Sequence, residues 1–582
     1  MAISSLSPSA LAVEGKLECR VLTDFAELEE LSTDWTRLQT AMGKGEIFQY
    51  FAWVAAWWQS LGKDCRLFTP VVLRQGRIVG ILPLVLTGRR LRFLGYSVSD
   101  YNHFLAEPFE GNAALEVCLD TLRMYASEWD EILLENIPES SLLAECIRSL
   151  PGGWQRSMVR MPGDPCPTLL MADNKQDVLK SSMDKLKRAV NRLRRMDKLT
   201  FRHIVDPTEA AAHLPQFFKQ HIRRSAMAGR RSGFLDEDYV AFYKNLLERV
   251  SPEKEIRFSV LELGGRAIAY HFGSLFNGKY LWYKPSFDVD LWELAPGQAM
   301  LWHLFEYLQT ADVHEFDFAR GDEAFKYRFS NHVRQNLNFT VYASGYRSAA
   351  RRMYRWMREA AKELVRKSPV LERALKAVRG IWQDTCLSYR CEGAKAAWRK
   401  LLCTSVFDKE ELWVVSIDSS NPSMQGQYEG SVNEISLGGL ADLAMSYPDT
   451  LKEDVMLKAR ELLRQKKTAW ITSFDGSEQM LVWTSVGTEL TTPTGTLPLP
   501  ETVMLIHEIR PLMFGGTRQD FVAVLRRFAS IAGAKDMSTW AVCPKRFLPS
   551  ERALRERGVN PEYRWVRTRI LGKTYSKQRE FG

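Results

Sequence analysis

Alternating apolar and polar positions flank a glycine-containing turn at three places in the chain. The segments are LFTPVVLRQGRIVGILPLVL around Gly76, IRFSVLELGGRAIAYHFGSLF around Gly265 and TAWITSFDGSEQMLVWTSV around Gly476. This pattern predicts a β-hairpin at each place, because side chains alternate between the two faces of a strand. The turns are 189 and 211 residues apart and helical patterns precede each hairpin, so we expect three α/β repeats, each the size of a domain.

The first repeat is expected over residues 17–162, after a disordered tail, residues 1–16, that is rich in Ser, Ala and Pro. Its pattern predicts strands over 18–22 and 131–135 and helices over 24–40, 50–61 and 113–127, with Ser140 capping a further short helix. Three prolines between residues 162 and 167 are expected to stop both helix and strand ladder. The second repeat, residues 163–345, is therefore expected to begin there.

The second repeat has the clearest pattern. Strands are predicted over 266–276 and 279–283, joined by Asn277-Gly278, a pair typical of a two-residue hairpin turn. A helix is predicted from Pro296 through Thr310, followed by a strand over 313–318. The apolar stripe of this helix consists of Leu301, Leu304, Phe305 and Leu308.

A basic connector, residues 346–405, separates the second repeat from the third, residues 406–582. Between Arg347 and Lys400 fifteen Lys and Arg face five Asp and Glu, a net charge of +10, whereas the whole chain carries +9. The excess charge therefore belongs to this segment, whose helical stripe includes Met353, Trp356 and Met357. Either the stripe packs on neighbouring domains and the basic face meets water, or the segment adsorbs to an anionic membrane surface.

Composition excludes several classes of protein. The chain has 582 residues, 45% hydrophobic and 26% charged, which indicates globular material with several cores. The longest apolar stretch, residues 78–86, is much shorter than the ~20 residues of a membrane-spanning helix. The N-terminus lacks the pattern of a secretory signal, so we expect a cytoplasmic protein. Nine scattered cysteines without a CxxC pair are expected to be reduced and to bind no metal.

Two places in the second repeat could carry chemistry. The helix that begins at Pro296, Gly297 and Gln298 would expose backbone N–H groups that can hold a phosphate. The strand that ends in ARGDEAFKYRF would place Asp322, as the cap of a short helix, beside Lys326 and Tyr327 at a sheet edge, where ligands commonly bind in α/β folds. From the residues alone, a capped surface turn with a solvated lysine is an equally good interpretation.

The second repeat resembles a known family. The run AIAYHFGSLFNGKYLWYKPSFDVDLWELAPGQAMLWHLFEYL, followed by HEFDFARGDEAFKYRF, resembles the CelD-type polysaccharide-biosynthesis branch of the GNAT acyltransferase superfamily, which is related to FemX-type aminoacyl transferases. The family pattern, D-F-x-x-G-D-E-x-Y-K, has a tyrosine before the lysine. Phe325 stands at that aromatic position here, which is a mild departure. FQYFAWVAAWW and SDYNHF extend the resemblance over the first repeat.

The resemblance implies tandem GNAT-like domains with mixed central sheets, and an acyl-CoA donor, most simply acetyl-CoA, held by Pro296, Gly297 and Gln298. Within such a site Lys326, fixed by Asp322, is expected to steady either a developing oxyanion or an acceptor phosphate, and Tyr327 is expected to supply a proton. His271 is either the general base or a hydrogen-bonded core histidine.

Acceptor contacts are expected from two further segments. The upstream helix carries four cations on one stripe and Leu186, Val190 and Leu193 on another, apolar stripe. The cations either form a solvated face or receive a phosphate. SDYNHF is expected to help enclose the acceptor. The residues concerned are Lys185, Arg188, Arg192 and Arg195 of the helix, and Tyr101, Asn102 and His103.

The third repeat resembles single-domain GNAT proteins, through its hairpin and through PSERALRERGV. The family's diphosphate loop, R-G-x-G, reads Phe514-Gly515-Gly516-Thr517 here, and Phe547 replaces the Asn before the Pro-Ser pair. Loss of the arginine removes a charge contact and loss of the second glycine removes a close backbone approach. This repeat is expected to be either degenerate, with a scaffolding role, or a second active site.

The function that we expect is transfer of an acyl group from acyl-CoA to an amine or hydroxyl of a sugar or cell-envelope polysaccharide precursor. One alternative is FemX-like aminoacyl transfer from charged tRNA, although the near-neutral charge outside the connector makes nucleic acid an unlikely partner. Another is a non-catalytic assembly factor for a membrane polysaccharide synthase. We expect a cytoplasmic protein that could contact the inner face of the membrane through residues 347–400.

Overall fold

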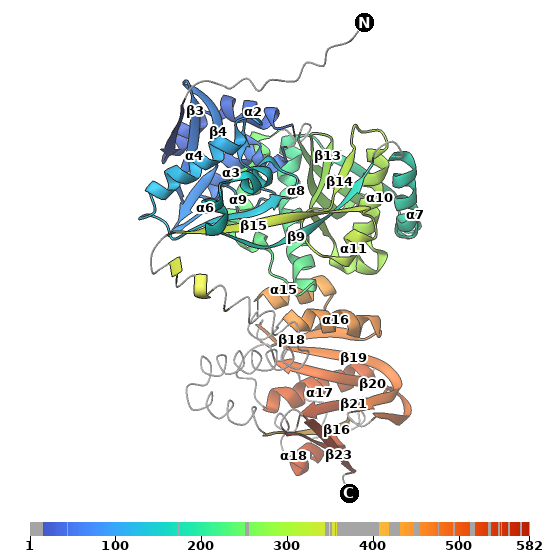
Figure 1. Ribbon diagram of the computed structural model, residues 1–582. Coiled ribbons are helices and arrows are strands. Elements are labelled where there is room, and N and C mark those ends of the chain that lie inside the picture. The colour runs from blue at the N-terminus through green and yellow to red at the C-terminus, as the bar shows by residue number, and fades with distance from the viewer. Residues whose placement is uncertain are drawn as a thin grey trace. The chain divides into compact units, whose positions relative to one another are not determined.

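The structure is a computed structural model (Figure 1). It describes residues 16–343 except 44, 172–174 and 251–254, a few residues between 348 and 357, and residues 407–580 with gaps at 418–430, 447–452, 475–476, 493–494, 512–517, 534–536, 545–547, 549, 557–558 and 571–572. The chain divides into two compact bodies. The N-terminal body comprises residues 1–222 and 232–359, and the C-terminal body comprises residues 223–231 and 360–582.

The first repeat supplies a four-stranded antiparallel sheet, in the order β1-β3-β4-β7, and one end of an eleven-stranded sheet. Its elements are β1 (Leu17–Leu22), α1 (Phe25–Glu30), α2 (Ser32–Ala41), η1 (Ile47–Gln49), α3 (Phe51–Leu61), β2 (Arg66–Leu67), β3 (Thr69–Arg74), β4 (Arg77–Ile81), β5 (Leu84–Thr87), β6 (Arg90–Phe93), β7 (Leu105–Ala106), α4 (Gly111–Met124), β8 (Glu131–Pro138), α5 (Leu142–Ser149) and α6 (Gly152–Ser157). The strands and helices expected over 18–22, 50–61 and 113–127 are confirmed within a few residues.

The second repeat supplies the other end of the eleven-stranded sheet, whose order is β10-β11-β12-β13-β14-β9-β15-β8-β6-β5-β2. Its elements are β9 (Met158–Leu170), α7 (Lys175–Arg194), β10 (Leu199–Ile204), α8 (Pro207–Met227), η2 (Gly233–Leu235), α9 (Glu237–Arg249), β11 (Ile256–Leu263), β12 (Arg266–Phe276), β13 (Lys279–Phe287), η3 (Val289–Leu294), α10 (Pro296–Leu308), β14 (Glu315–Asp317), α11 (Ala324–Tyr327) and β15 (His332–Tyr342). The Asn277-Gly278 turn is confirmed, with φ of 49° and 68°.

The prediction that Pro162 to Pro167 stops the strand ladder is wrong. These residues lie inside β9, where Pro162, Pro165 and Pro167 pair with β15. Along this stretch β9 has a strand neighbour on one side only, because its pairing with β14 begins at Thr168. On the other side the Pro167 and Pro165 carbonyls accept from the Phe318 and Gly321 N–H groups of the turn after β14, bonds for which a proline needs no N–H. An edge position tolerates residues that cannot donate to a ladder. The first and second repeats are therefore joined through a continuous sheet and not by a linker.

Three smaller expectations also differ from the structure. The short helix after β8 is capped by Ser141, whose side chain accepts from Ala144 N–H, and not by Ser140. The strand expected to end at Tyr283 continues to Phe287, and the strand expected over 313–318 is shorter, Glu315–Asp317. Strand ends are hard to place from alternation when aromatic residues continue past the last pair.

A parallel strand pair recurs once in each repeat. β6 pairs in parallel with β8, β13 with β14, and β20 with β21, and the antiparallel pairs surround them. In the second repeat the pairing covers only Lys279–Leu281 of β13, which then continues for six residues without β14 beside it. The two strands therefore separate at their carboxyl ends.

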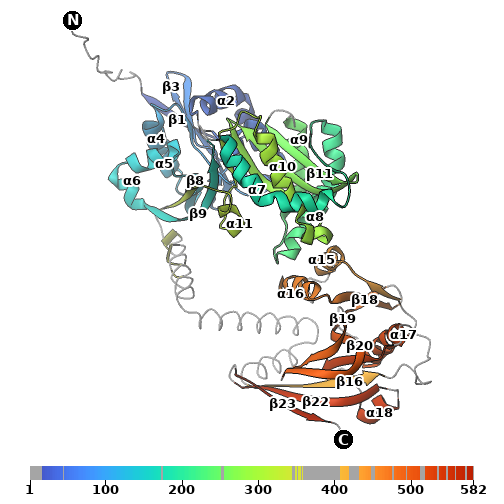
Figure 2. The same ribbon diagram turned by 90° about the vertical axis from the view of Figure 1, so that its right-hand side faces the viewer.

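Helices cover both faces of the sheet in the second repeat. α7 and α10 lie side by side on one face, over Tyr280, Trp282 and Phe316 (Figures 1 and 2). On the other face, α3 of the first repeat packs with α9, and their aromatic residues share a core with Phe258, Tyr270 and Phe272. The core between the two repeats is therefore continuous.

The C-terminal body has an eight-stranded sheet in the order β17-β18-β19-β20-β21-β16-β22-β23. The helix expected over 518–531 is confirmed. Residues 514–517 and Phe547, where this repeat departs from the family pattern, lie outside the described residues, as does the connector beyond residue 357. The elements are β16 (Phe407–Ile417), β17 (Ser431–Glu434), α15 (Leu437–Ser446), α16 (Glu453–Arg464), β18 (Thr468–Phe474), β19 (Ser477–Thr492), β20 (Gly495–Pro511), α17 (Arg518–Gly533), β21 (Thr539–Pro544), α18 (Glu551–Arg555), β22 (Val559–Ile570) and β23 (Lys573–Glu580).

Candidate functional site

The two candidate places of the second repeat lie at the same edge of the sheet. α10 follows the carboxyl end of β13 through η3, and the turn 318–323 follows the carboxyl end of β14. Because β13 and β14 run in parallel, their carboxyl ends meet at one edge. The divergence of β13 from β14 opens the sheet between the two places, as ligand sites in α/β sheets require.

The start of α10 is accessible to solvent. Pro296 is the first helical residue, Gly297 is partly exposed and Gln298 is exposed. No side chain caps this helix, whose N-cap residue Ala295 has the left-handed conformation, with φ of 55° and ψ of 54°. A side chain at Gly297 would come no closer than 3.4 Å to the Phe287 ring. The positive end of the helix dipole is therefore open to an anion.

The basic stripe of α7 connects the two places. The Lys185 ammonium donates to the Arg328 carbonyl at 2.9 Å, next to α11, and the Arg192 guanidinium donates to the Glu293 carbonyl at 3.0 Å, just before α10. Arg188 is exposed between them, and Arg195 lies one residue beyond the end of the helix. The opposite stripe, Leu186, Val190 and Leu193, is buried as predicted.

Lys326 stabilises the turn that follows β14. Its ammonium donates to the carbonyls of Ala319 at 3.2 Å and Arg320 at 2.7 Å, and pairs with the Glu323 carboxylate at 2.9 Å. The side chain is only 6% exposed. An ammonium has three donors, so a substrate oxygen could bind Lys326 only in place of one of these partners.

Asp322 does not cap α11, because the N-cap residue is Glu323 and its side chain makes no capping bond. Instead, the exposed Asp322 carboxylate accepts a hydrogen bond from the Tyr327 hydroxyl. This bond raises the pKa of Tyr327 to about 12. A phenol with a raised pKa is a weaker acid, so transfer of its proton to a thiolate is uphill.

His271 lies in the core of the second repeat and is fully buried. Its ring stacks on Trp282 with centroids 4.4 Å apart, and its Nδ1 is 3.4 Å from the Tyr280 hydroxyl. Burial lowers the pKa of His271 to about 3, so the imidazole is neutral at pH 7. The burial favours the core-histidine interpretation over the general-base interpretation.

Tyr101, Asn102 and His103 are buried between the first and second repeats. The Tyr101 hydroxyl donates to Asp317 at 2.9 Å and the Asn102 amide donates to the Glu135 carbonyl at 2.9 Å. Burial lowers the pKa of His103 to about 4. The structure thus brings SDYNHF beside the turn after β14, but these three side chains face protein groups and not solvent.

Sequence reasoning missed a buried group of charged residues that crosses between the repeats. The Arg334 guanidinium pairs with Asp317, with Glu315 at 3.1 Å and with Glu46 at 3.6 Å, and Lys279 pairs with Glu46 at 2.9 Å. Glu46 and Lys279 lie more than 200 residues apart in sequence. The only local sign is that Glu315 and Asp317 alternate with apolar residues in HEFDF.

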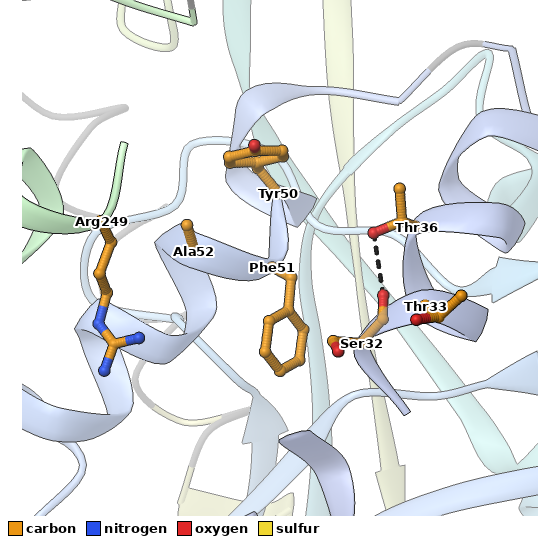
Figure 3. A pocket seen from close by; sticks show the side chains of 7 residues that line it. All are labelled: Ser32, Thr33, Thr36, Tyr50, Phe51, Ala52 and Arg249. Carbon is orange, nitrogen blue, oxygen red and sulfur yellow. Dashed lines mark hydrogen bonds between the residues drawn. The ribbon is translucent and has the colours of Figure 1, made fainter. Parts of the chain in front are cut away.

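A separate cavity of about 530 Å³ lies where α2, α3 and α9 meet. Ser32, Thr33 and Thr36 line one side and Arg249 the other, and Figure 3 shows the Phe51 and Arg249 side chains extending in the same direction. Burial, together with the neighbouring Glu255 carboxylate, raises the pKa of Tyr50. The cavity is shallow and largely open to solvent.

The described part of the chain shows neither a metal cluster nor a membrane span. Within it, no group of three or more His, Cys, Asp or Glu side chains is arranged to hold a metal ion. Its helices are also too short or too polar to cross a bilayer.

Comparison with protein families assigns the second repeat. Residues 180–327 match the family described as an acetyltransferase (GNAT) domain. The match begins in α7 and ends at Tyr327, so it includes both candidate places. The chain therefore contains a GNAT acetyltransferase domain, which belongs to a class of acyltransferase-type enzymes. No curated protein matches the sequence significantly.

Several solved structures resemble this chain at low sequence identity. FemX is 10% identical with a TM-score of 0.41, over 56% of this chain and 97% of its own. A tandem GNAT protein from the clavulanic acid biosynthesis pathway is 14% identical with a TM-score of 0.36, over 57% and 100%. L-PGS from Bacillus licheniformis is 12% identical with a TM-score of 0.35, over 54% and 92%.

Proposed function

We propose that the second repeat transfers an acyl group from acyl-CoA to an amine or hydroxyl acceptor. The observation that carries this proposal is the match of residues 180–327 to the GNAT acetyltransferase domain. The open sheet edge between β13 and β14, with the α10 start and the turn 318–323 beside it, supports the proposal, since it gives a donor and an acceptor a common meeting place.

The donor would lie along β13 with its diphosphate at Gly297 and Gln298. Past Leu281, β13 pairs with β12 on one side and leaves β14 on the other. An extended chain of amides, such as the arm of coenzyme A, can hydrogen-bond to a strand edge of this kind. Arg192, beside the α10 start, would contribute positive charge to the phosphates.

The acceptor would lie beside the turn 318–323, with Arg188 and Lys185 along its approach. Lys326 would act in one of two ways: through a direct contact with the developing oxyanion, or by holding the carbonyls of Ala319 and Arg320 in place. Direct transfer also needs a base for the acceptor proton. His271, at a pKa of about 3 and without access to solvent, is not our candidate for that base.

The pathway proposal is acylation of a sugar or a cell-envelope polysaccharide precursor. It is supported by the resemblance of AIAYHFGSLF and ARGDEAFKYRF to the CelD-type branch.

Calorimetry on the full chain tests the donor. Acetyl-CoA, longer acyl-CoAs and CoA should give saturable heats, and the acyl forms should bind at the same site as CoA in competition. Absence of any saturable heat with all three would contradict acyl-CoA transfer and leave an aminoacyl-tRNA donor or a scaffold. If acyl-CoA does bind, release of free thiol from acyl-CoA when candidate amino sugars are added would identify the acceptor class.

A further inference from the structure

The carboxylate of Asp317, the last residue of β14, joins three parts of the N-terminal body. Its Oδ1 accepts from the Ala319 backbone N–H at 2.8 Å and from the Tyr101 hydroxyl at 2.9 Å, and its Oδ2 accepts from the Arg334 guanidinium. Asp317 thus connects the turn after its own strand with the first repeat and with β15. The residue is 1% exposed, so water does not compete for these bonds.

The bond to Ala319 shapes the turn that carries Lys326. Ala319 has φ of +59°, a left-handed conformation that costs energy in any residue with a Cβ. An aspartate that bonds to the backbone two residues ahead stabilises such a turn. The carbonyls of Ala319 and Arg320, which this conformation orients, are the acceptors for the Lys326 ammonium.

Several charged and titratable groups face Asp317. Asp317 and its neighbours together contain three buried carboxylates and two cations, so the cluster as a whole has a net negative charge. The groups are Arg334 on β15, Glu315 on β14, Glu46 before η1 with its partner Lys279 on β13, Tyr101 and His103 in SDYNHF, and Cys166 on β9. Proton uptake by this cluster therefore relieves repulsion between its carboxylates.

We propose that Asp317 is the positioning residue for the turn 318–323 and that Tyr101 makes the turn depend on the first repeat. The effect on transfer rests on the proposed function of the second repeat, whereas the effect on the turn does not. An amide in place of the Asp317 carboxylate would lose the charge for Arg334, and its remaining bonds to Ala319 and Tyr101 would weaken because a neutral acceptor is poorer than a carboxylate.

The pH dependence expected from Asp317 follows from its surroundings. Burial raises the pKa of this carboxyl to about 6, and the opposing attraction of Arg334 does not fully offset it. An opened turn would expose the carboxyl to water and return its pKa towards the ordinary range. The closed turn therefore binds the proton more tightly than the open turn, so proton uptake by Asp317 does not favour opening.

Hydrogen–deuterium exchange on the full chain tests the proposal. Tyr101→Phe and Asp317→Asn should each speed exchange in peptides covering residues 318–330 by about tenfold, the effect of losing one buried hydrogen bond. Tyr270→Phe is the matched control, because it removes another buried phenol bond, to His213, away from this turn. After correction for intrinsic rates, wild-type protection of 318–330 should not fall through Asp317 between pH 7 and pH 5.

Unchanged exchange in 318–330 for both variants would overturn the proposal. The proposal would also be overturned if the Tyr270→Phe control sped exchange throughout the N-terminal body, 318–330 included, by the same factor as Tyr101→Phe. Tyr101→Phe keeps the test valid if Asp317→Asn fails to fold. Where acyl transfer is measurable, Tyr101→Phe should lower kcat and leave the KM for acyl-CoA unchanged. If the wild-type protein binds no acyl-CoA while Tyr101→Phe and Asp317→Asn still speed exchange in 318–330, only the proposed function is contradicted.

Discussion

The imidazole of His271 occupies the space that a side chain at Gly273 would need. A Cβ built on Gly273 would come within 2.2 Å of His271 Cε1 and within 2.4 Å of the Leu281 carbonyl oxygen. The register between β12 and β13 shifts at this point. Two residues apart on one strand, His271 and Gly273 share a face, so the glycine allows both the stacked histidine and the close approach of β13.

Gly273→Ala should therefore destabilise the N-terminal body by roughly 2–4 kcal/mol, in the range of overpacked or strained core positions. The urea midpoint of unfolding measures this. His271→Ala in the same chain should recover only part of the loss, because the clash with the Leu281 backbone remains. Gly153→Ala is the control, since no atom lies within 4 Å of its added Cβ. Equal midpoints for Gly273→Ala and Gly153→Ala would contradict the argument.

Stability should fall as the pH falls below about 6.5. Burial lowers the pKa of His103 and His203 to about 4 and that of His271 to about 3. The unfolded chain binds a proton at each of these positions near pH 6.5 and the folded chain does not, so unfolding takes up protons. Asp317, with its pKa raised to about 6, acts in the opposite direction, because its folded form binds a proton that the unfolded form releases.

Burial also lowers the pKa of His303 and His507, so five described histidines act against the one carboxyl and leave a net loss of stability towards pH 4. Urea midpoints between pH 4.5 and 7.5 measure the slope. His271→Phe should reduce it by about 1.4 kcal/mol per pH unit, the effect of one proton. His332→Asn, a substitution at an exposed histidine, is the control variant. A slope that is the same in His271→Phe and wild type would show that His271 is not held neutral by the fold.

Lys326→Met should lower the free energy of unfolding by about 1–3 kcal/mol, because two carbonyls and the Glu323 carboxylate lose their donor in a buried place. Chemical denaturation measures this, and acyl transfer should fall in parallel. Lys185→Met removes a cation that makes one exposed backbone bond and serves as the control. Full stability of Lys326→Met with lost transfer would instead indicate direct contact with the reacting atoms.

Gly297→Ala separates donor binding from folding. The added Cβ meets only the Phe287 ring at ordinary contact distance, and alanine favours a helix more than glycine does, so the melting temperature should stay the same or rise. If the α10 start holds a diphosphate, the methyl group should weaken acetyl-CoA binding by roughly tenfold, about 1.4 kcal/mol. Calorimetry decides, with Gly153→Ala as control. Unchanged affinity would remove Gly297 from the donor site.

Deletion of residues 347–400 should abolish sedimentation with anionic vesicles, because this segment carries the excess positive charge of the chain. Vesicles of phosphatidylcholine with and without phosphatidylglycerol, each at two salt concentrations, measure the effect. Binding that persists after the deletion would contradict adsorption through the connector.

Local patterns were sufficient to predict the elements around the site. Asn277-Gly278 indicates the hairpin of β12 and β13, and the spacing of Leu186, Val190 and Leu193 indicates the buried face of α7. Both depend on short-range preferences, namely left-handed conformations in the turn and the period of the helix.

Local patterns were insufficient where distant segments decide the structure. Pro162 to Pro167 reads as a break, yet β15, more than 160 residues later, pairs with it along an open edge. The ion pair of Glu46 with Lys279 likewise depends on the packing of one repeat against another, so no local pattern reveals it. Burial of Lys326 and His271 follows from the same packing, which changes the chemistry that each side chain can perform.

The shared strands β9 and β15 have a consequence for inheritance and expression. A fragment that stops near residue 162 would lose β15 and most of β9, exposing the edge of β8 to other chains. A fragment that starts near residue 162 would contain β15 without its partner β8, so one edge of β15 would be exposed. The first and second repeats therefore depend on each other within one polypeptide. Recombination between the two repeats in evolution must preserve both β9 and β15.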